Sequence, residues 1–198
     1  VADAAAVNLA LTRLTQLIPQ LNPESYPAQW KREAEYVYNR TDKFTIGYIA
    51  YFLATIALLT ALAVQRKWLI TAGVALLLAG FATHAAGMAV RGVISGRWPI
   101  HNQYESYIFI SLSAVAVGII MMAVTRKWLY GAAAAALGTL TLLLANTVPI
   151  PSREVGQVAG ILATSRILYV HVNLVLASYG LIALGFFMSL FYLGVHYF

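Results

Sequence analysis

Apolar and polar positions in this chain fall into long blocks. After a polar N-terminal segment, five apolar runs follow one another, and the first four each have about the ~20 residues that a helix needs to cross a bilayer. The fifth run is longer, and we expect its end to reach into water. The pattern predicts an all-α, polytopic membrane helical bundle with five transmembrane helices, at about residues 44–64, 68–90, 106–124, 128–148 and 167–198.

Residues 1–43 are polar enough to stay outside the bilayer and form a short amphipathic arm. Apolar residues recur at helical spacing between Ala4 and Leu21, which predicts a helix lying in the membrane interface. Asn22-Pro23-Glu24 ends this helix, and Pro27 to Arg40 predicts a second short one. The chain therefore divides into an arm, 1–43, and a transmembrane helical domain, 44–198.

Composition supports a membrane protein and excludes several other classes. Of the residues, 61% are hydrophobic and only 10% are charged, whereas a soluble domain carries about 25% charged residues. The chain has no cysteine, so it has no disulfide, no thiolate metal site and no Cys-x-x-Cys-His site for covalent haem. The net charge of +6 lies mostly in short loops and the arm, which indicates membrane topology and no nucleic-acid partner.

Two short connections are near copies of each other and predict the topology. They read Gln65-Arg66-Lys67-Trp68-Leu69 and Thr125-Arg126-Lys127-Trp128-Leu129. Short loops rich in Lys and Arg stay cytoplasmic, and Trp anchors the ends of the spans. We therefore expect an integral membrane protein with its N-terminus outside, its C-terminus inside, and residues 91–105 and 149–166 on the outer side.

The predicted outward loop from Arg91 to Tyr107 concentrates charge in a chain where charge is scarce. Arg91 and Arg97 could bind a carboxylate, because guanidinium presents a matching fork of donors. Alternatively, they pair with Glu105 and hold the loop in an ordered conformation, and the two interpretations are compatible. Candidate residues at the start of the third helix complete this site: Asn102, Tyr104 and Glu105, whose carboxylate suits a helix N-terminus.

Histidines are the candidate metal ligands. His84 is expected about two turns below the outer surface, and His171 at the start of the fifth span on the same side. Imidazole inside a membrane is costly to leave unpaired and is a good axial ligand for haem iron; the alternative is a histidine that only bonds a neighbouring helix. His101 is expected to be exposed in the outer loop, and His196 interfacial at the inner end. No pattern indicates hydrolytic chemistry.

Two motifs resemble the CcsA/ResC family of cytochrome c assembly proteins. The first is Gly96-Arg97-Trp98-Pro99-Ile100-His101-Asn102-Gln103-Tyr104-Glu105-Ser106, preceded by His84, Gly87 and Arg91. It is similar to the family pattern H-x-x-G-x-x-x-R followed by S-G-x-x-P-x-x-N-x-Y-E-S. The second is Ser165-Arg166-Ile167-Leu168-Tyr169-Val170-His171-Val172, followed by Ala177-Ser178-Tyr179-Gly180. The segment from Glu35 to Arg40 resembles the junction where a CcsB-type part is fused ahead of a CcsA-type part.

The resemblance implies that the chain binds haem b in the membrane and presents it outside for attachment to apocytochrome c. The position of His171 matches a haem-ligating histidine of the family, and Arg97 and Arg166 are the expected partners of the haem propionates. The resemblance also implies a CcsB/ResB-type partner or fused domain. It implies that the chain is a haem transporter or part of a cytochrome c synthase rather than a self-contained enzyme. The family's Trp-rich haem segment and a second outer histidine are missing, so we expect a truncated chain.

Two other functions are compatible with the same residues. A haem b or quinone-binding subunit of an electron-transfer complex would use His84 and His171 as a bis-histidine pair. A structural membrane subunit would use the histidines only for packing.

Overall fold

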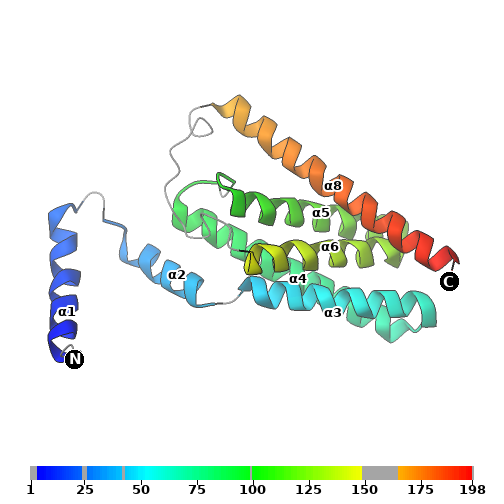
Figure 1. Cartoon of the computed structure of the whole chain (residues 1–198), viewed down its shortest axis with the longest axis horizontal. Coiled ribbons are helices and arrows are strands. Elements are labelled where there is room, and N and C mark those ends of the chain that lie inside the picture. The colour runs from blue at the N-terminus through cyan, green and yellow to red at the C-terminus, as the bar shows by residue number, and fades with distance from the viewer. Residues whose placement is uncertain (1–3, 24–25, 42, 99, 149–164, 198) are drawn as a thin grey trace.

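The computed structural model describes residues 4–23, 26–41, 43–98, 100–148 and 165–197. Its regular structure is entirely helical within these ranges (Figure 1). The helices are α1 (Ala4–Leu21), α2 (Gln29–Arg40), α3 (Lys43–Val64), α4 (Lys67–Ser95), α5 (Gln103–Thr125), α6 (Trp128–Thr147) and α8 (Arg166–Tyr197).

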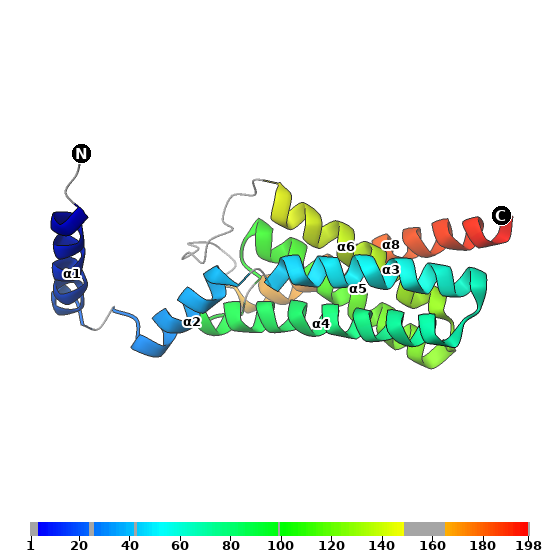
Figure 2. The ribbon, with the colours of Figure 1, turned by 90° about the horizontal axis from the view of Figure 1, so that it is seen from below.

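Five of these helices, α3, α4, α5, α6 and α8, are long and apolar enough to cross a membrane. They form an elongated bundle in which α3 packs on α4 and α6, and α5 packs on α6 and α8 (Figures 1 and 2). We call the end that carries residues 96–102 the loop end, and the end that carries the turns at 65–66 and 126–127 the basic end. The predicted all-α membrane bundle with five spans is confirmed.

The predicted loop between the second and third spans is shorter in the structure. Helix α4 continues to Ser95 and α5 begins at Gln103, so only residues 96–102 lie between them. The prediction that the loop extends from Arg91 to Tyr107 was therefore wrong in its bounds. Arg91 and Glu105 lie on helices and are each only 1% exposed.

One aromatic ring lies where three helices meet in the middle of the bundle. Tyr51 of α3 is fully buried, and its ring lies between Gly80 of α4 and Gly138 of α6. A Cβ atom at either glycine would come within 2.8 Å of a ring carbon of Tyr51, closer than van der Waals contact allows. Glycine at both positions therefore lets α4 and α6 pack closely against the two sides of the Tyr51 ring of α3.

The N-terminal arm consists of two helices with different surroundings. Helix α1 has the predicted bounds and buries none of its residues. Helix α2 begins two residues after the predicted start and packs on α4, where Tyr38 is 7% exposed. Both helices lie beyond the loop end of the bundle (Figure 1). The predicted outer connection at 149–166 lies, up to residue 164, outside the described residues.

Candidate functional site

A buried ion cluster joins α4, α5 and the short loop between them. The Nε atom of Arg91 donates to one carboxylate oxygen of Glu105 at 2.8 Å. A terminal nitrogen of Arg97 donates to the other oxygen at 3.1 Å, and so does the backbone N–H of His101 at 2.9 Å. One carboxylate therefore receives three donors from two segments, and the predicted pairing of Glu105 with Arg91 and Arg97 is confirmed.

Local sequence at each end of the loop prepares this geometry. Helix α4 ends at Gly96, whose φ of 66° lies in the left-handed region that glycine enters without strain. The Arg97 N–H then returns to the Gly92 carbonyl at 3.3 Å. Helix α5 begins with Asn102 as its N-cap, and the Asn102 side chain accepts from the Glu105 N–H at 2.8 Å. The turn and the cap together aim Glu105 at the two guanidinium groups.

Aromatic side chains enclose the arginine at the centre of the cluster. The guanidinium carbon of Arg91 lies 5.1 Å from the ring centroid of Tyr104, within the range of a cation–π contact. Tyr38 of α2 is buried at the same end of α4 and interacts with Arg91. The cluster therefore lies where α2 packs on α4, which the sequence did not predict.

His101 connects this cluster to α8. Its ring stacks on Tyr169 with centroids 5.4 Å apart, and its Nδ1 atom lies 2.9 Å from the Trp98 carbonyl. Because His101 is half-buried, the expectation of a simply exposed residue was wrong. The stack brings the first turn of α8 to the loop end, although the two residues lie far apart in sequence.

His84 is enclosed in the bundle. It has no exposed surface, and it lies eleven residues before the end of α4, a rise of about 16 Å. It therefore lies farther from the end of its helix than predicted, because α4 is longer than predicted. Its Nε2 atom lies 3.1 Å from the Ile108 carbonyl, which can only accept, so Nε2 carries the proton. Its Nδ1 atom then accepts from the Tyr51 hydroxyl at 3.3 Å.

His171 has very different surroundings from His84. It lies in the second turn of α8 at the loop end, its side chain is exposed, and it makes no hydrogen bond within the described part of the chain. The structure does not bring His171 and His84 together. Arg166, at the first residue of α8, is also exposed and forms no ion pair with a described residue. His196 lies at the basic end, where it stacks on Tyr192.

Three tyrosines support the site, and sequence reasoning missed all of them: Tyr38, Tyr51 and Tyr169. Nothing in the sequence around each of them separates a buried tyrosine from an exposed one. The signal that could have found Tyr51 is that a buried polar side chain needs a hydrogen-bonding partner. His84 in the middle of a span predicts a hydrogen-bonding partner on a neighbouring helix, and Tyr51 is that partner.

The fold and this site define the chain as a polytopic helical membrane protein with an ion cluster buried at one end of its bundle. No family model matches the chain. It is 32% identical over 99 residues to the cytochrome c biogenesis protein CcsA of Cyanidium caldarium, an alignment that covers 50% of this chain and 33% of CcsA. It is also 29% identical over 189 residues to Protein NrfI of Wolinella succinogenes, across 87% of this chain and 19% of NrfI.

The similarity to CcsA supports the resemblance that the two sequence motifs predict. The chain spans a third of the length of CcsA and about a fifth of the length of NrfI.

Proposed function

We propose that this chain is part of a cytochrome c biogenesis protein that binds haem in the membrane and presents it at the loop end for attachment to apocytochrome c. The observation that carries this proposal is the similarity to CcsA, whose name assigns it to cytochrome c biogenesis. The five spans agree with a role in the membrane. In this proposal haem b is the cargo, and a CcsB/ResB-type partner or fused domain supplies the rest of the assembly.

His171 is the proposed ligand of the haem iron. A ligand must offer a nitrogen lone pair to an arriving molecule, and His171 is an exposed imidazole without a hydrogen-bonding partner among the described residues. For His84 to ligate iron, it would first lose its bond to Tyr51 inside a fully buried site. We therefore assign His84 to holding α3, α4 and α5 together, and the ligand role to His171.

The arginines divide into two roles in the same way. Arg97 keeps 22% of its side chain exposed and Arg166 is exposed, so both can meet haem propionates from the aqueous side. Arg91 is buried beneath them and holds Glu105. Glu105, Asn102 and Tyr104 then order the loop that carries Arg97, without contacting haem themselves.

The proposal is tested by cytochrome c maturation in the protein as its gene encodes it. His171→Ala is expected to abolish maturation while the protein still inserts, because the loss of one axial ligand leaves haem weakly held. Added imidazole is expected to restore part of the activity by filling the vacant coordination position.

His196→Ala is the matched control, since His196 is an exposed histidine near the other end of the same helix. Normal maturation by His171→Ala, or an equal loss in His196→Ala, would contradict the assignment.

A further inference from the structure

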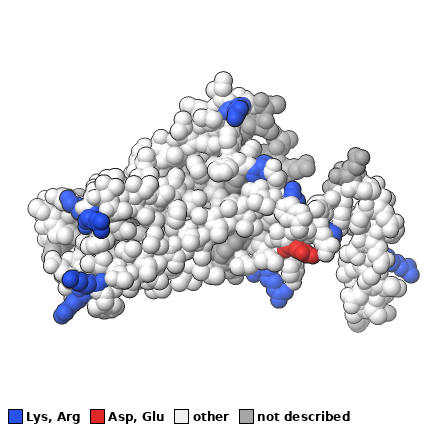
Figure 3. Space-filling model, turned by 180° about the vertical axis from the view of Figure 1, so that it is seen from behind, with Lys and Arg blue, Asp and Glu red and all other residues white. Residues whose placement is uncertain are grey.

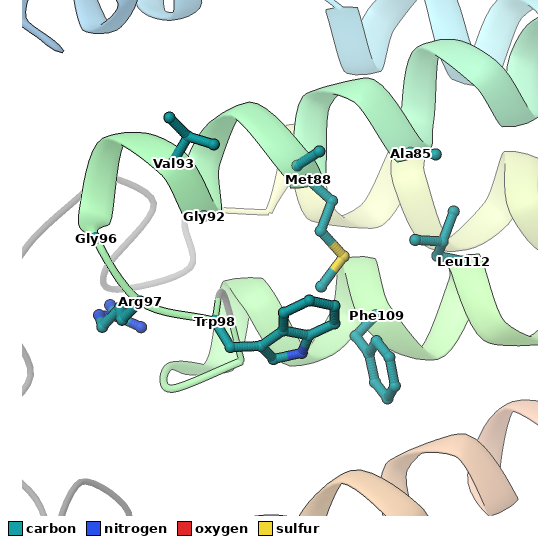
Figure 4. A pocket seen from close by; sticks show the side chains of 10 residues that line it. Ala85, Met88, Gly92, Val93, Gly96, Arg97, Trp98, Phe109 and Leu112 are labelled. Carbon is teal, nitrogen blue, oxygen red and sulfur yellow. The ribbon is translucent and has the colours of Figure 1, made fainter.

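An apolar groove runs along the loop-end half of α4, where α4 faces α5 (Figure 4). Its volume is about 640 Å³, within the range of about 300–1,000 Å³ typical of small-molecule pockets. One wall is a stripe of small residues on α4 that includes Ala85, Ala89 and Gly92. These residues have little or no side chain beyond Cβ, so they present a smooth surface to whatever lies in the groove.

The groove has the length of one bilayer leaflet. Ala85 and Gly96 both line it and are eleven residues apart on the helix and its cap, a rise of about 16 Å. Half of the hydrocarbon core is about 15 Å thick. Trp98, which is 62% exposed, marks the loop end of the groove, as interfacial tryptophans mark the edge of the hydrocarbon. Both walls are spans, so the groove is open to lipid rather than to water alone.

The side chains in the groove favour a flat aromatic body. In Figure 4 the Met88 side chain and the rings of Trp98 and Phe109 converge on the same space from α4, the loop and α5. Aromatic faces and a polarizable thioether make favourable contacts with another aromatic surface. No histidine is among the described residues that line the groove, and Met88 is only 6% exposed, so the groove presents mainly aromatic and aliphatic surface to a ligand.

Charge is confined to one end of the groove. Arg97 is the only charged residue among the described lining residues, and it lies at the loop end, beyond Trp98 (Figure 4). The cluster to which it belongs contains two guanidinium groups and one carboxylate, Arg91, Arg97 and Glu105, which sum to a formal charge of +1. An apolar body with a carboxylate at its interfacial end complements this arrangement.

We propose that this groove binds a porphyrin dicarboxylate from the lipid phase, by its ring and its carboxylates and without a bond to iron. The inference rests on the proposed function, which makes haem the cargo, and adds a second site to it. The groove receives the macrocycle laterally, with the carboxylates at Arg97, which it shares with the proposed site at His171, and it needs no bond to that histidine.

The test uses metal-free protoporphyrin IX, which cannot bind to a histidine through iron, and the protein in nanodiscs. Ala89→Phe places a ring in the groove from an exposed position of α4 and is expected to weaken binding about tenfold or more, since a well-packed contact of about 1.4 kcal/mol corresponds to that factor. Ala86→Phe is the matched control: Ala86 is an exposed alanine of the same helix that does not line the groove. It is expected to bind as the wild type does.

The carboxylates are tested on the ligand, which leaves the ion cluster intact. Protoporphyrin IX dimethyl ester is expected to bind about tenfold more weakly than the free acid, because esterification removes the negative charges that strengthen hydrogen bonds from a guanidinium group. Equal affinity of the ester would overturn the role of Arg97. Equal affinity of Ala89→Phe and the wild type would overturn the groove, and so would a phospholipid displaced by Ala89→Phe with porphyrin binding unchanged. None of these outcomes depends on whether His171 is needed for cytochrome c maturation.

Discussion

The two ends of the helical bundle both carry cations, but they use them differently. At the basic end Arg66, Lys67, Arg126 and Lys127 are all exposed, and Figure 3 shows Lys and Arg gathered on the surface there. At the loop end Arg91 is 1% exposed and shares one carboxylate with Arg97. Exposed cations in short turns favour one orientation in the membrane, whereas a buried arginine needs a partner to be stable. The same residue types are therefore exposed in turns at one end and form a buried ion cluster at the other.

The largest expected difference between the ends concerns stability. Glu105→Ala leaves Arg91 buried without its carboxylate, and we expect a loss of about 3–5 kcal/mol in the free energy of unfolding. Lys127→Ala at the basic end is expected to change it by less than about 0.5 kcal/mol. Both are measured by unfolding in mixed SDS micelles.

The double substitution Arg91→Met with Glu105→Leu sharpens this result. Removing both charges is expected to recover most of the lost stability, because an apolar pair of similar volume costs little in such a site. A loss from Glu105→Ala as small as that from Lys127→Ala would show that the two ends do not differ.

A smaller difference in the free energy of unfolding is expected from the N-terminal caps of α5 and α6. The Asn102 side chain caps α5, whereas Lys127 at the start of α6 makes no side-chain capping bond. Asn102→Ala is therefore expected to cost about 0.5–2 kcal/mol, measured in the same unfolding assay. If Asn102→Ala has no more effect than Lys127→Ala, the cap does not contribute to the order of the loop.

The orientation of the two ends is tested without changing stability. The chain has no cysteine, so single cysteines can be introduced at the exposed positions Arg166 and Lys127. We expect an impermeant thiol reagent to label Arg166→Cys from outside intact cells and not Lys127→Cys. The reverse pattern would place the loop end inside and remove the proposed site of haem presentation.

Much of the fold could be predicted, because spans of about twenty apolar residues and Arg-Lys-Trp turns are local features. The bounds of α3 and α6 differ from the prediction by one residue at most. The predicted ends of α4 and α5 are wrong because Arg91 and Glu105 interrupt the apolar runs without ending the helices. Arg91 and Glu105 stay inside helices because each neutralises the other from the neighbouring helix, and pairing of this kind is not visible along one helix.

The same boundary error placed His84 closer to the end of its helix than it lies in the structure. Only the packing of α3 and α5 shows that His84 is enclosed. Likewise, the stack of His101 on Tyr169 joins segments with no local relation in sequence. The motif residues of the loop could be predicted to be coupled, because Arg and Glu lie close together in the sequence and charge is rare in this chain.

The central claim is that His171 ligates haem iron, and the most direct measurement is the absorption spectrum of haem bound to the purified protein as its gene encodes it. We predict that His171→Ala changes the Soret and visible bands and lowers haem occupancy, that added imidazole returns the spectrum toward that of the wild type, and that His196→Ala leaves it unchanged. A wild-type spectrum and occupancy in His171→Ala would contradict the account.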